Sequence, residues 1–408
     1  MRGKIINDPV YGFIRFPEKE LMQVIEHPWF QRLRRIKQMG MAHLVYPGAV
    51  HTRFHHSLGA AHLMNIALAE LNSKGIDISR EECIAARLAI LMHDIGHGPF
   101  SHGLEHTIVH GISHEGISKM IMQRLNERFD GLLTEAISIF ENTHPKTFLH
   151  QLVSSQLDMD RMDYLNRDSF YTGVSEGVIG YDRILQMLTV KDGNLVVEEK
   201  GIHSVEKFII ARRLMYWQVY LHKTVLGAEQ LIINILRRAR QLAQSGTQLF
   251  ATPALHFFLY EKITGSDFAA DPSVLDKFCL LDDADIAASI KVWAAHPDPV
   301  LSRLCTMMLD RRLYKVKLST QPLTEEFLQM QQHVAASGKI NKNELPFYLF
   351  EGSTSNSTYN QNDERINILM KKGDVVNISQ VDNALIGSDL TVPVEKFYIC
   401  SVPPESTL

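Results

Sequence analysis

The sequence predicts a mainly α-helical protein with a small β-hairpin near residues 188–199 and a smaller C-terminal α+β part. Three observations carry this prediction. Apolar residues recur at helical spacing along residues 54–72 and 80–94. Asp192-Gly193 stands between two runs rich in β-branched residues, which is typical of a tight two-residue turn. From about residue 345, strand-like runs separated by Asn, Ser and Gly replace the helical pattern.

The elements follow in order along the chain. Residues 1–16 predict extended chain and a turn, and a first helix starts at Pro17-Glu18. Pro28 opens a second helix, which Gly40 ends, and a loop leads to residue 53. Further helices are expected at 54–72, 80–94, 113–128, 131–141, 146–166, 203–244 and over most of 252–335. Residues 353–363 predict a loop. We expect two parts, residues 1–250 and 251–408, with the functional core at about 50–170.

Composition excludes several classes of protein. Of the 408 residues, 45% are hydrophobic and 22% charged, which is ordinary for a globular chain. The formal net charge of −4 argues against a nucleic-acid binder. The chain contains no run of 18 apolar residues, so the sequence predicts no membrane-spanning helix. The N-terminus lacks the apolar stretch that is expected of a secretory leader. The four cysteines form no CxxC pair, so we expect a reducing, cytoplasmic location.

Histidines indicate a functional site. The chain has 19, and 12 of them lie between His27 and His114. His93 and Asp94 are adjacent at the end of an apolar helix, where one divalent cation could bind both side chains. Taken alone, this pair also fits a helix end at which the histidine interacts with the helix dipole.

Two further helices supply inward-facing ionisable residues. His56 lies on the apolar stripe of residues 54–72, whereas His55 points about 100° away from it. Asp160 shares a face with Val153 and Leu157, and a buried carboxylate needs a partner. One divalent cation would satisfy His56, His93-Asp94 and Asp160 together. We expect two other acidic residues of this segment, Asp158 and Asp163, to be solvated or to cap helices.

These residues stand in segments that resemble a known family. RFHHSLG, LMHDIGHGPFSH and LDMDRMDYLNRD look like the H…HD…D pattern of the HD-domain phosphohydrolase superfamily. INDPVYG, FQRLRRIKQMG and YWQVYLHK extend the resemblance to the deoxynucleoside triphosphate (dNTP) triphosphohydrolases, including the vertebrate members that carry a SAM domain before the HD domain. The resemblance covers roughly residues 4–240. It implies an HD-type helical bundle, and we expect no SAM domain because the motifs begin almost at Met1.

The resemblance also implies roles for individual residues. The ligands of one divalent metal ion per chain (Mn, Fe, Ni, Zn or Mg) would be His56, His93, Asp94 and Asp160. The residues near the phosphates and the attacked phosphorus would be His97, His102, Glu105, His114, Arg53, Arg161 and Lys223. The sugar and base neighbours would be Gln38, Met39, Tyr164, Asp168 and Tyr220. Two of these depart from the pattern of the vertebrate members, which have Asp where Glu105 stands and Leu where Met39 stands, and this puts sugar and base selectivity in question.

A second site is implied near the N-terminus. An activating nucleotide would contact Lys4, Asn7, Glu26, Gln31 and Arg34, although the same residues could instead build a subunit interface or scaffold. The resemblance further implies a homo-oligomer, either a dimer or a tetramer.

The sequence therefore predicts a metal-dependent hydrolase that converts dNTPs to deoxynucleoside and triphosphate. Two alternatives stay open. One is an HD-type phosphatase or phosphodiesterase acting on another nucleotide. The other is a metal-binding regulatory or scaffold protein with little turnover, which the complete His/His/Asp/Asp set disfavours.

Overall fold

Helix α3 (Arg53–Ser73) lies at the centre of the N-terminal part and packs against α4 (Arg80–Met92) and α9 (Met159–Thr172). The computed structural model describes residues 3–101, 109, 111–336, 340–356, 365–381 and 394–403. Besides the expected stripe from His56 to Leu71, α3 also buries Phe54, Ala61 and Met64. A helix buried on most of its circumference is typical of the core of a large domain.

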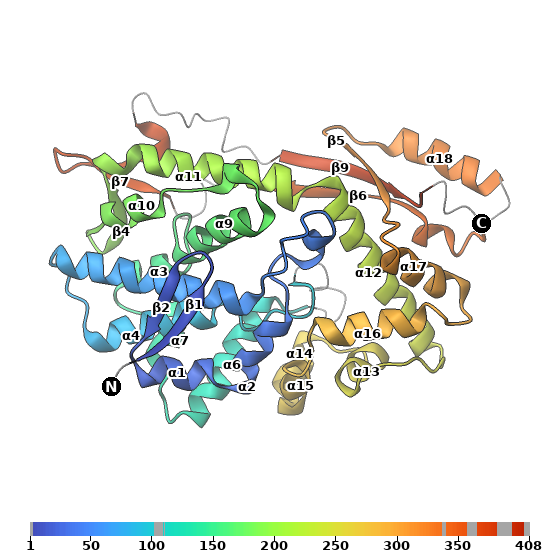
Figure 1. Ribbon diagram of the computed structural model, residues 1–408, viewed down its shortest axis with the longest axis horizontal. Coiled ribbons are helices and arrows are strands. Elements are labelled where there is room, and N and C mark those ends of the chain that lie inside the picture. The colour runs from blue at the N-terminus through green and yellow to red at the C-terminus, as the bar shows by residue number, and fades with distance from the viewer. Residues whose placement is uncertain are drawn as a thin grey trace.

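The other helices surround this core and extend away from it (Figure 1). Those of the N-terminal part are α1 (Lys19–Ile25), α2 (Pro28–Gln31), α6 (His114–Arg128), α7 (Thr134–Phe140), α8 (Thr147–Val153), α10 (Tyr181–Met187), α11 (Ile202–Met215) and α12 (Lys223–Gln244). Those that follow are α13 (Pro253–Tyr260), α14 (Gly265–Ala270), α15 (Pro272–Phe278), α16 (Asp283–Trp293), α17 (Pro299–Leu309) and α18 (Thr324–Ala336). The prediction of a mainly α-helical fold is confirmed.

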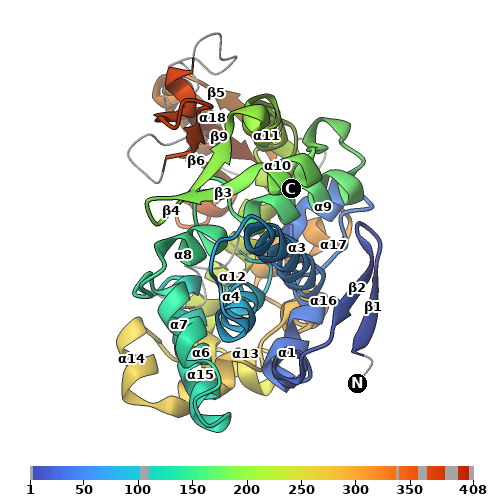
Figure 2. The same cartoon turned by 90° about the vertical axis from the view of Figure 1, so that its left-hand side faces the viewer.

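Three small sheets complete the fold. An antiparallel hairpin joins β1 (Lys4–Asp8) to β2 (Gly12–Phe16) and lies along one edge of the molecule (Figure 2). The expected hairpin near residue 192 is present as β3 (Leu188–Lys191) and β4 (Asn194–Glu198). It continues into β7 (Asn367–Leu369), parallel to β4, and β8 (Val375–Asn377). The third sheet has the order β5 (Lys315–Ser319), β9 (Val394–Ser401), β6 (Leu349–Asn356). The C-terminal part therefore shares a sheet with the N-terminal part.

Two predicted helices are shorter than expected. The helix from Pro28 stops at Gln31 and becomes the 3₁₀ turn η1 (Arg32–Arg35), in which the buried Arg32 guanidinium donates to the carbonyls of Ile95, His97 and Leu281. The helix expected at 146–166 is two helices, α8 and α9. Asp158 begins the second by accepting a hydrogen bond from the Arg161 backbone N–H at 2.7 Å.

The long helix predicted for 203–244 is also interrupted. After α11, a π-helical turn, η6 (Tyr216–Tyr220), leads to His222, whose ring accepts a hydrogen bond from the Thr224 N–H at 3.2 Å and so caps α12. The Tyr46 hydroxyl donates to the Gln218 carbonyl inside the turn. Such turns often occur at functional sites, and this one places Tyr216 and Tyr220 in the wall of a cavity. None of the helices in the described part of the chain has the length and apolarity needed to cross a bilayer.

Candidate metal centre and adjoining cavity

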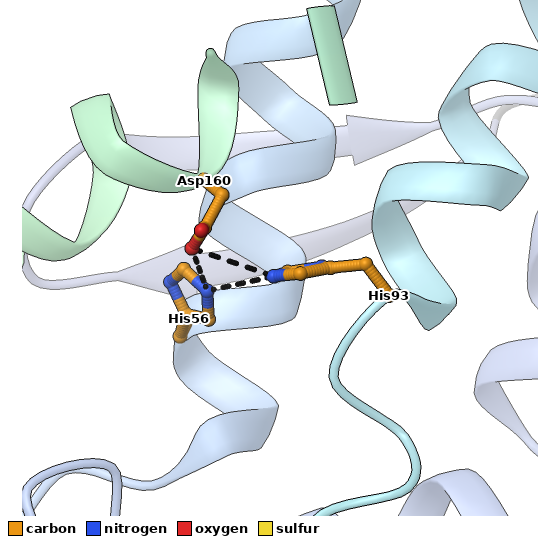
Figure 3. A group of neighbouring side chains, drawn as sticks. All are labelled: His56, His93 and Asp160. Atoms are coloured by element: carbon orange, nitrogen blue, oxygen red, sulfur yellow. Dashed lines mark hydrogen bonds and ion pairs between the residues drawn. The ribbon is translucent and has the colours of Figure 1, made fainter. Parts of the chain in front are cut away.

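Three predicted metal ligands from three elements meet at one point (Figure 3). His56 comes from α3, His93 follows the last turn of α4, and Asp160 stands in the first turn of α9. His56 Nε2 lies 3.1 Å from Asp160 Oδ1 and 3.4 Å from His93 Nε2, and His93 Nε2 lies 3.4 Å from the same carboxylate oxygen. Two nitrogens and one oxygen at these separations form a donor set suited to a divalent metal.

The other ring nitrogen of each histidine is already engaged. His56 Nδ1 lies 2.7 Å from Asp163 Oδ2, and His93 Nδ1 lies 2.6 Å from the Ile90 carbonyl oxygen. Because a carboxylate and a carbonyl only accept, both Nδ1 atoms must carry the hydrogen. In the neutral rings, both Nε2 lone pairs then face each other and need a cation between them. The residues present therefore fit a metal ion.

Charge in the cluster leads to the same conclusion. Burial opposes protonation of His56, yet hydrogen bonds that its ring donates to Asp160 and Asp163 raise its pKa to about 10. Asp160 is only partly buried, and although this burial acts to raise its pKa, the two histidines hold that pKa well below the ordinary value. The cluster thus stabilises positive charge, which a divalent cation would supply in place of protons.

Asp163 was expected to be solvated or to cap a helix, and this expectation is wrong. Its side chain is fully buried, and both of its oxygens bind Arg167, at 2.9 Å from Nε and from Nη2. Arg167 Nη1 reaches Asp8 of β1 at 2.8 Å. A Cβ on Gly59 would lie 2.0 Å from Asp163 Oδ1, so only glycine lets α9 approach α3 this closely. The Asp163–Arg167 spacing of four residues was the signal in the sequence for this pair.

Asp94 lies beside the cluster and links it to Arg53. Its Oδ1 is 3.4 Å from His93 Nε2 and 3.3 Å from His97 Nε2, while its Oδ2 is 3.6 Å from His56 Nε2 and accepts from Arg53 Nη1. Burial acts to raise the pKa of Asp94, but Arg53 holds it well below the ordinary value. Burial and the Arg53 charge together lower the pKa of His97 well below 6.5, which keeps that ring neutral.

The loop that follows Asp94 is held in place by contacts between its backbone and helix α6. Ser118 of α6 donates to the His93 carbonyl at 2.8 Å and accepts from the Gly96 N–H at 2.9 Å. A Cβ on Gly96 would lie 2.2 Å from the His114 carbonyl oxygen, so glycine allows the loop to pack on the start of α6. The rings of His97 and His114 consequently stack with centroids 3.8 Å apart.

A cavity of about 440 Å³ opens beside this cluster. Its volume is in the range of small-molecule sites. Predicted site residues in its wall are Gln38, Met39, Arg53, Asp94, His97, His114, Asp160, Tyr164, Asp168 and Tyr220. Asp168 is buried there, 2.7 Å from His51 Nε2, and accepts from the Tyr220 hydroxyl at 2.5 Å. Sequence reasoning did not identify His51, Tyr216, Glu229 or Thr354, although the last three also line the cavity.

Other predicted residues lie elsewhere. Arg161 Nη1 donates to Asp158 Oδ2 at 2.6 Å and is not in the cavity wall, and Lys223 is exposed at the start of α12. His102 and Glu105 are outside the described residues. His55 points away from the cluster, as expected, and its ring accepts from the Thr52 N–H at 3.2 Å.

The residues expected at an effector site form two surface pairs. Lys4 Nζ lies 3.1 Å from Glu26 Oε1, with more than half of each side chain exposed. Arg34 Nε donates to Gln31 Oε1 at 2.8 Å, and its guanidinium stacks on the Phe54 ring. Asn7 pairs with Phe13 in the β1–β2 hairpin. An effector role for these five residues stays a prediction.

Comparison with known proteins agrees with this geometry. The HD domain family matches residues 53–168, and the HD associated region matches residues 179–250. A solved phosphohydrolase from Bacteroides thetaiotaomicron superposes with a TM-score of 0.92 at 50% identity, over 98% of this chain and 100% of that one. The uncharacterized protein YwfO of Bacillus subtilis is 32% identical over 92% of this chain and 87% of its own.

A more distant relative has a named substrate class. The deoxynucleoside triphosphate triphosphohydrolase SAMHD1 homolog of Dictyostelium discoideum is 32% identical over 60% of this chain. The match spans 51% of that relative's length. From the domain match, the related structure and the His/Asp cluster, the chain belongs to the HD-domain phosphohydrolase superfamily.

Proposed function

We propose that this hydrolase converts deoxynucleoside triphosphates to the deoxynucleoside and intact triphosphate. The observation that carries the proposal is the single cavity that holds Asp94, Asp160 and Arg53 at one place and Tyr164, Asp168 and Tyr220 along its wall. The first group suits a metal ion and a phosphate, and the second suits a sugar with its base. The likeness to a named triphosphohydrolase supports the same substrate class.

In this proposal one divalent ion, held by His56, His93, Asp94 and Asp160, would activate water and neutralise charge on phosphorus. Water adds to the α-phosphorus, the bond from phosphorus to the 5′ oxygen breaks, and a proton passes to that oxygen. His114 would donate this proton, and its position in the cavity wall, stacked on His97, supports this role. Arg53 would bind phosphate while it remains paired with Asp94.

Asp168 would orient the sugar. Its carboxylate is held on both oxygens by His51 and Tyr220, so its position is fixed before any ligand binds. A fixed acceptor beside the aromatic rings of Tyr164 and Tyr220 would receive a hydrogen bond from a sugar hydroxyl.

Product analysis tests this proposal. Purified protein would be incubated with the four dNTPs, the four NTPs, monophosphates and cyclic nucleotides, each with Mn²⁺, Fe²⁺, Ni²⁺, Zn²⁺ or Mg²⁺. Ion-exchange chromatography should show equal amounts of deoxynucleoside and intact triphosphate, and Asp160→Ala should abolish both. Release of orthophosphate or pyrophosphate from dNTPs, or turnover of monophosphates or cyclic nucleotides alone, would contradict the proposal.

We also propose that the chain acts as a homo-oligomer. Phe13 and Ile5 of the β1–β2 hairpin are 71% and 50% exposed, and Phe170 of α9 is 56% exposed. Exposed apolar side chains of this size often mark protein contacts. Light scattering should give a mass of at least two chains, and Phe13→Asp should lower it. A single-chain mass at every concentration would contradict the proposal.

A further inference from the structure

The cavity beside the metal cluster extends to the C-terminal sheet. Besides Tyr220, its wall includes Val225 and Glu229 of α12 and Thr354 of β6. Val225 and Glu229 are one helical turn, about 6 Å, apart along the axis. Glu229 therefore lines the cavity from inside α12, farther along the chain than the proposed sugar contact at Tyr220, and Thr354 lines it from β6.

Close packing holds the sheet against α12. A Cβ on Gly227 would lie 2.8 Å from the Tyr314 carbonyl oxygen, so the helix and the segment entering β5 approach at backbone distance. Gly352 pairs with Tyr398 across β6 and β9, and a Cβ on Gly352 would lie 2.5 Å from the tyrosine hydroxyl oxygen. Thr354 is two residues farther along β6 and shares the face of Gly352. The sheet thus contributes Thr354 to a cavity whose other polar groups come from the N-terminal part.

Glu229 differs from the other carboxylates of the cavity. Asp94, Asp160 and Asp168 each have close polar partners. For Glu229, no hydrogen bond or ion pair is found with any residue that the structure describes, although its side chain is partly buried. Burial raises the pKa of this carboxyl from 4.5 to about 7. A partly buried carboxyl without a partner is less favourable than one in open water, and a ligand with N–H groups would relieve this.

We propose that Glu229 selects the nucleobase by accepting a hydrogen bond from an amino group on its far edge. The inference rests on the proposed function, because it places a nucleotide in the cavity with its phosphates at the metal cluster. Adenine and cytosine present such an amino group, N6 or N4, at the position where guanine and thymine present a carbonyl oxygen that a carboxylate repels. The preferred substrates are therefore nucleotides of adenine or cytosine, and thymine and guanine nucleotides are disfavoured.

Glu229→Gln tests this selectivity with little change in volume. The kcat/KM of wild type and variant would be measured for dATP, dCTP, dGTP and dTTP, together with Kd values from calorimetry. Loss of a charged hydrogen bond should lower the preference for the best amino-bearing base over thymine by roughly tenfold or more. Glu127→Gln, on an exposed position of α6, is the matched control and should leave every ratio unchanged. If Glu229→Gln does not fold, Glu229→Met keeps a similar length and removes the oxygen acceptor altogether, whereas Gln retains an uncharged one.

The outcomes separate this inference from the proposed function. Equal effects of Glu229→Gln on all four nucleotides, or a wild type that prefers dTTP or dGTP, would overturn the role of Glu229 even if triphosphate is released. If wild type hydrolyses no dNTP, the proposed function fails, and the Kd ratios decide the role of Glu229. Binding ratios that change by tenfold would then support it, and unchanged ratios would reject it.

Discussion

Replacing Asp163 by Asn should weaken metal binding although Asp163 is not a ligand. Asn has nearly the same shape but carries no charge. In the native protein the carboxylate accepts from His56 Nδ1 at 2.7 Å and from two Arg167 nitrogens at 2.9 Å. An amide oxygen cannot replace all three contacts, and its NH₂ group would face a donor. Arg167 would then keep only Asp8, at 2.8 Å, as a charged partner.

Two magnitudes follow from this geometry. Removing one partner of a buried ion pair costs about 3–5 kcal/mol, and the remaining contact to Asp8 places the expected loss near the lower end, about 3 kcal/mol. Loss of the group that orients a metal-binding histidine typically lowers metal affinity by about 10–100-fold. Both effects act through one series of side-chain contacts, which runs from Asp8 to Arg167, then to Asp163, and finally to His56.

The assay separates the two effects. Urea unfolding of metal-free protein gives the loss of stability, and competition with a chelator gives the metal affinity of the folded protein. Glu206→Gln is the control, because Glu206 is also a buried carboxylate with a histidine neighbour, His203 at 2.9 Å, but lies on α11. It should leave metal affinity unchanged. An Asp163→Asn protein with wild-type metal affinity would refute the reasoning.

Three further predictions concern single residues. Elemental analysis should find about one metal ion per chain in wild type and in His55→Ala but much less in Asp94→Ala, and full metal content in Asp94→Ala would remove this residue from the ligand set. Because a proton donor acts in the transition state, His114→Ala should lower kcat by about 10²–10⁴-fold with little change in KM, and normal turnover would make His114 a packing residue. Since burial raises the pKa of Glu229 from 4.5 to about 7, its ionisation opposes folding. Stability should therefore fall as pH rises from about 4.5 to 7, and Glu229→Gln should remove this part of the decline in urea midpoints measured against pH.

Local pattern predicted much of the helical part and the positions of the cluster residues. The stripe from His56 to Leu71 predicted α3, and the same spacing placed His56 inside and His55 outside. The local pattern did not predict the ends of helices whose terminal residues bind groups far away in the sequence. At the end of the helix from Pro28, Arg32 binds three carbonyls, one of them at Leu281, far along the chain.

The sequence by itself determined the fold class and the residue types of a metal site, because helical periodicity and ligand chemistry are local properties. Only the tertiary structure decided that Asp163 supports His56, since Gly59 lets α9 approach α3 closely enough for this contact. The tertiary structure also decided that Glu229 and Thr354 line the same cavity. They are 125 residues apart in the sequence, and both line this cavity because the C-terminal sheet packs against α12 through β5, which no local pattern encodes.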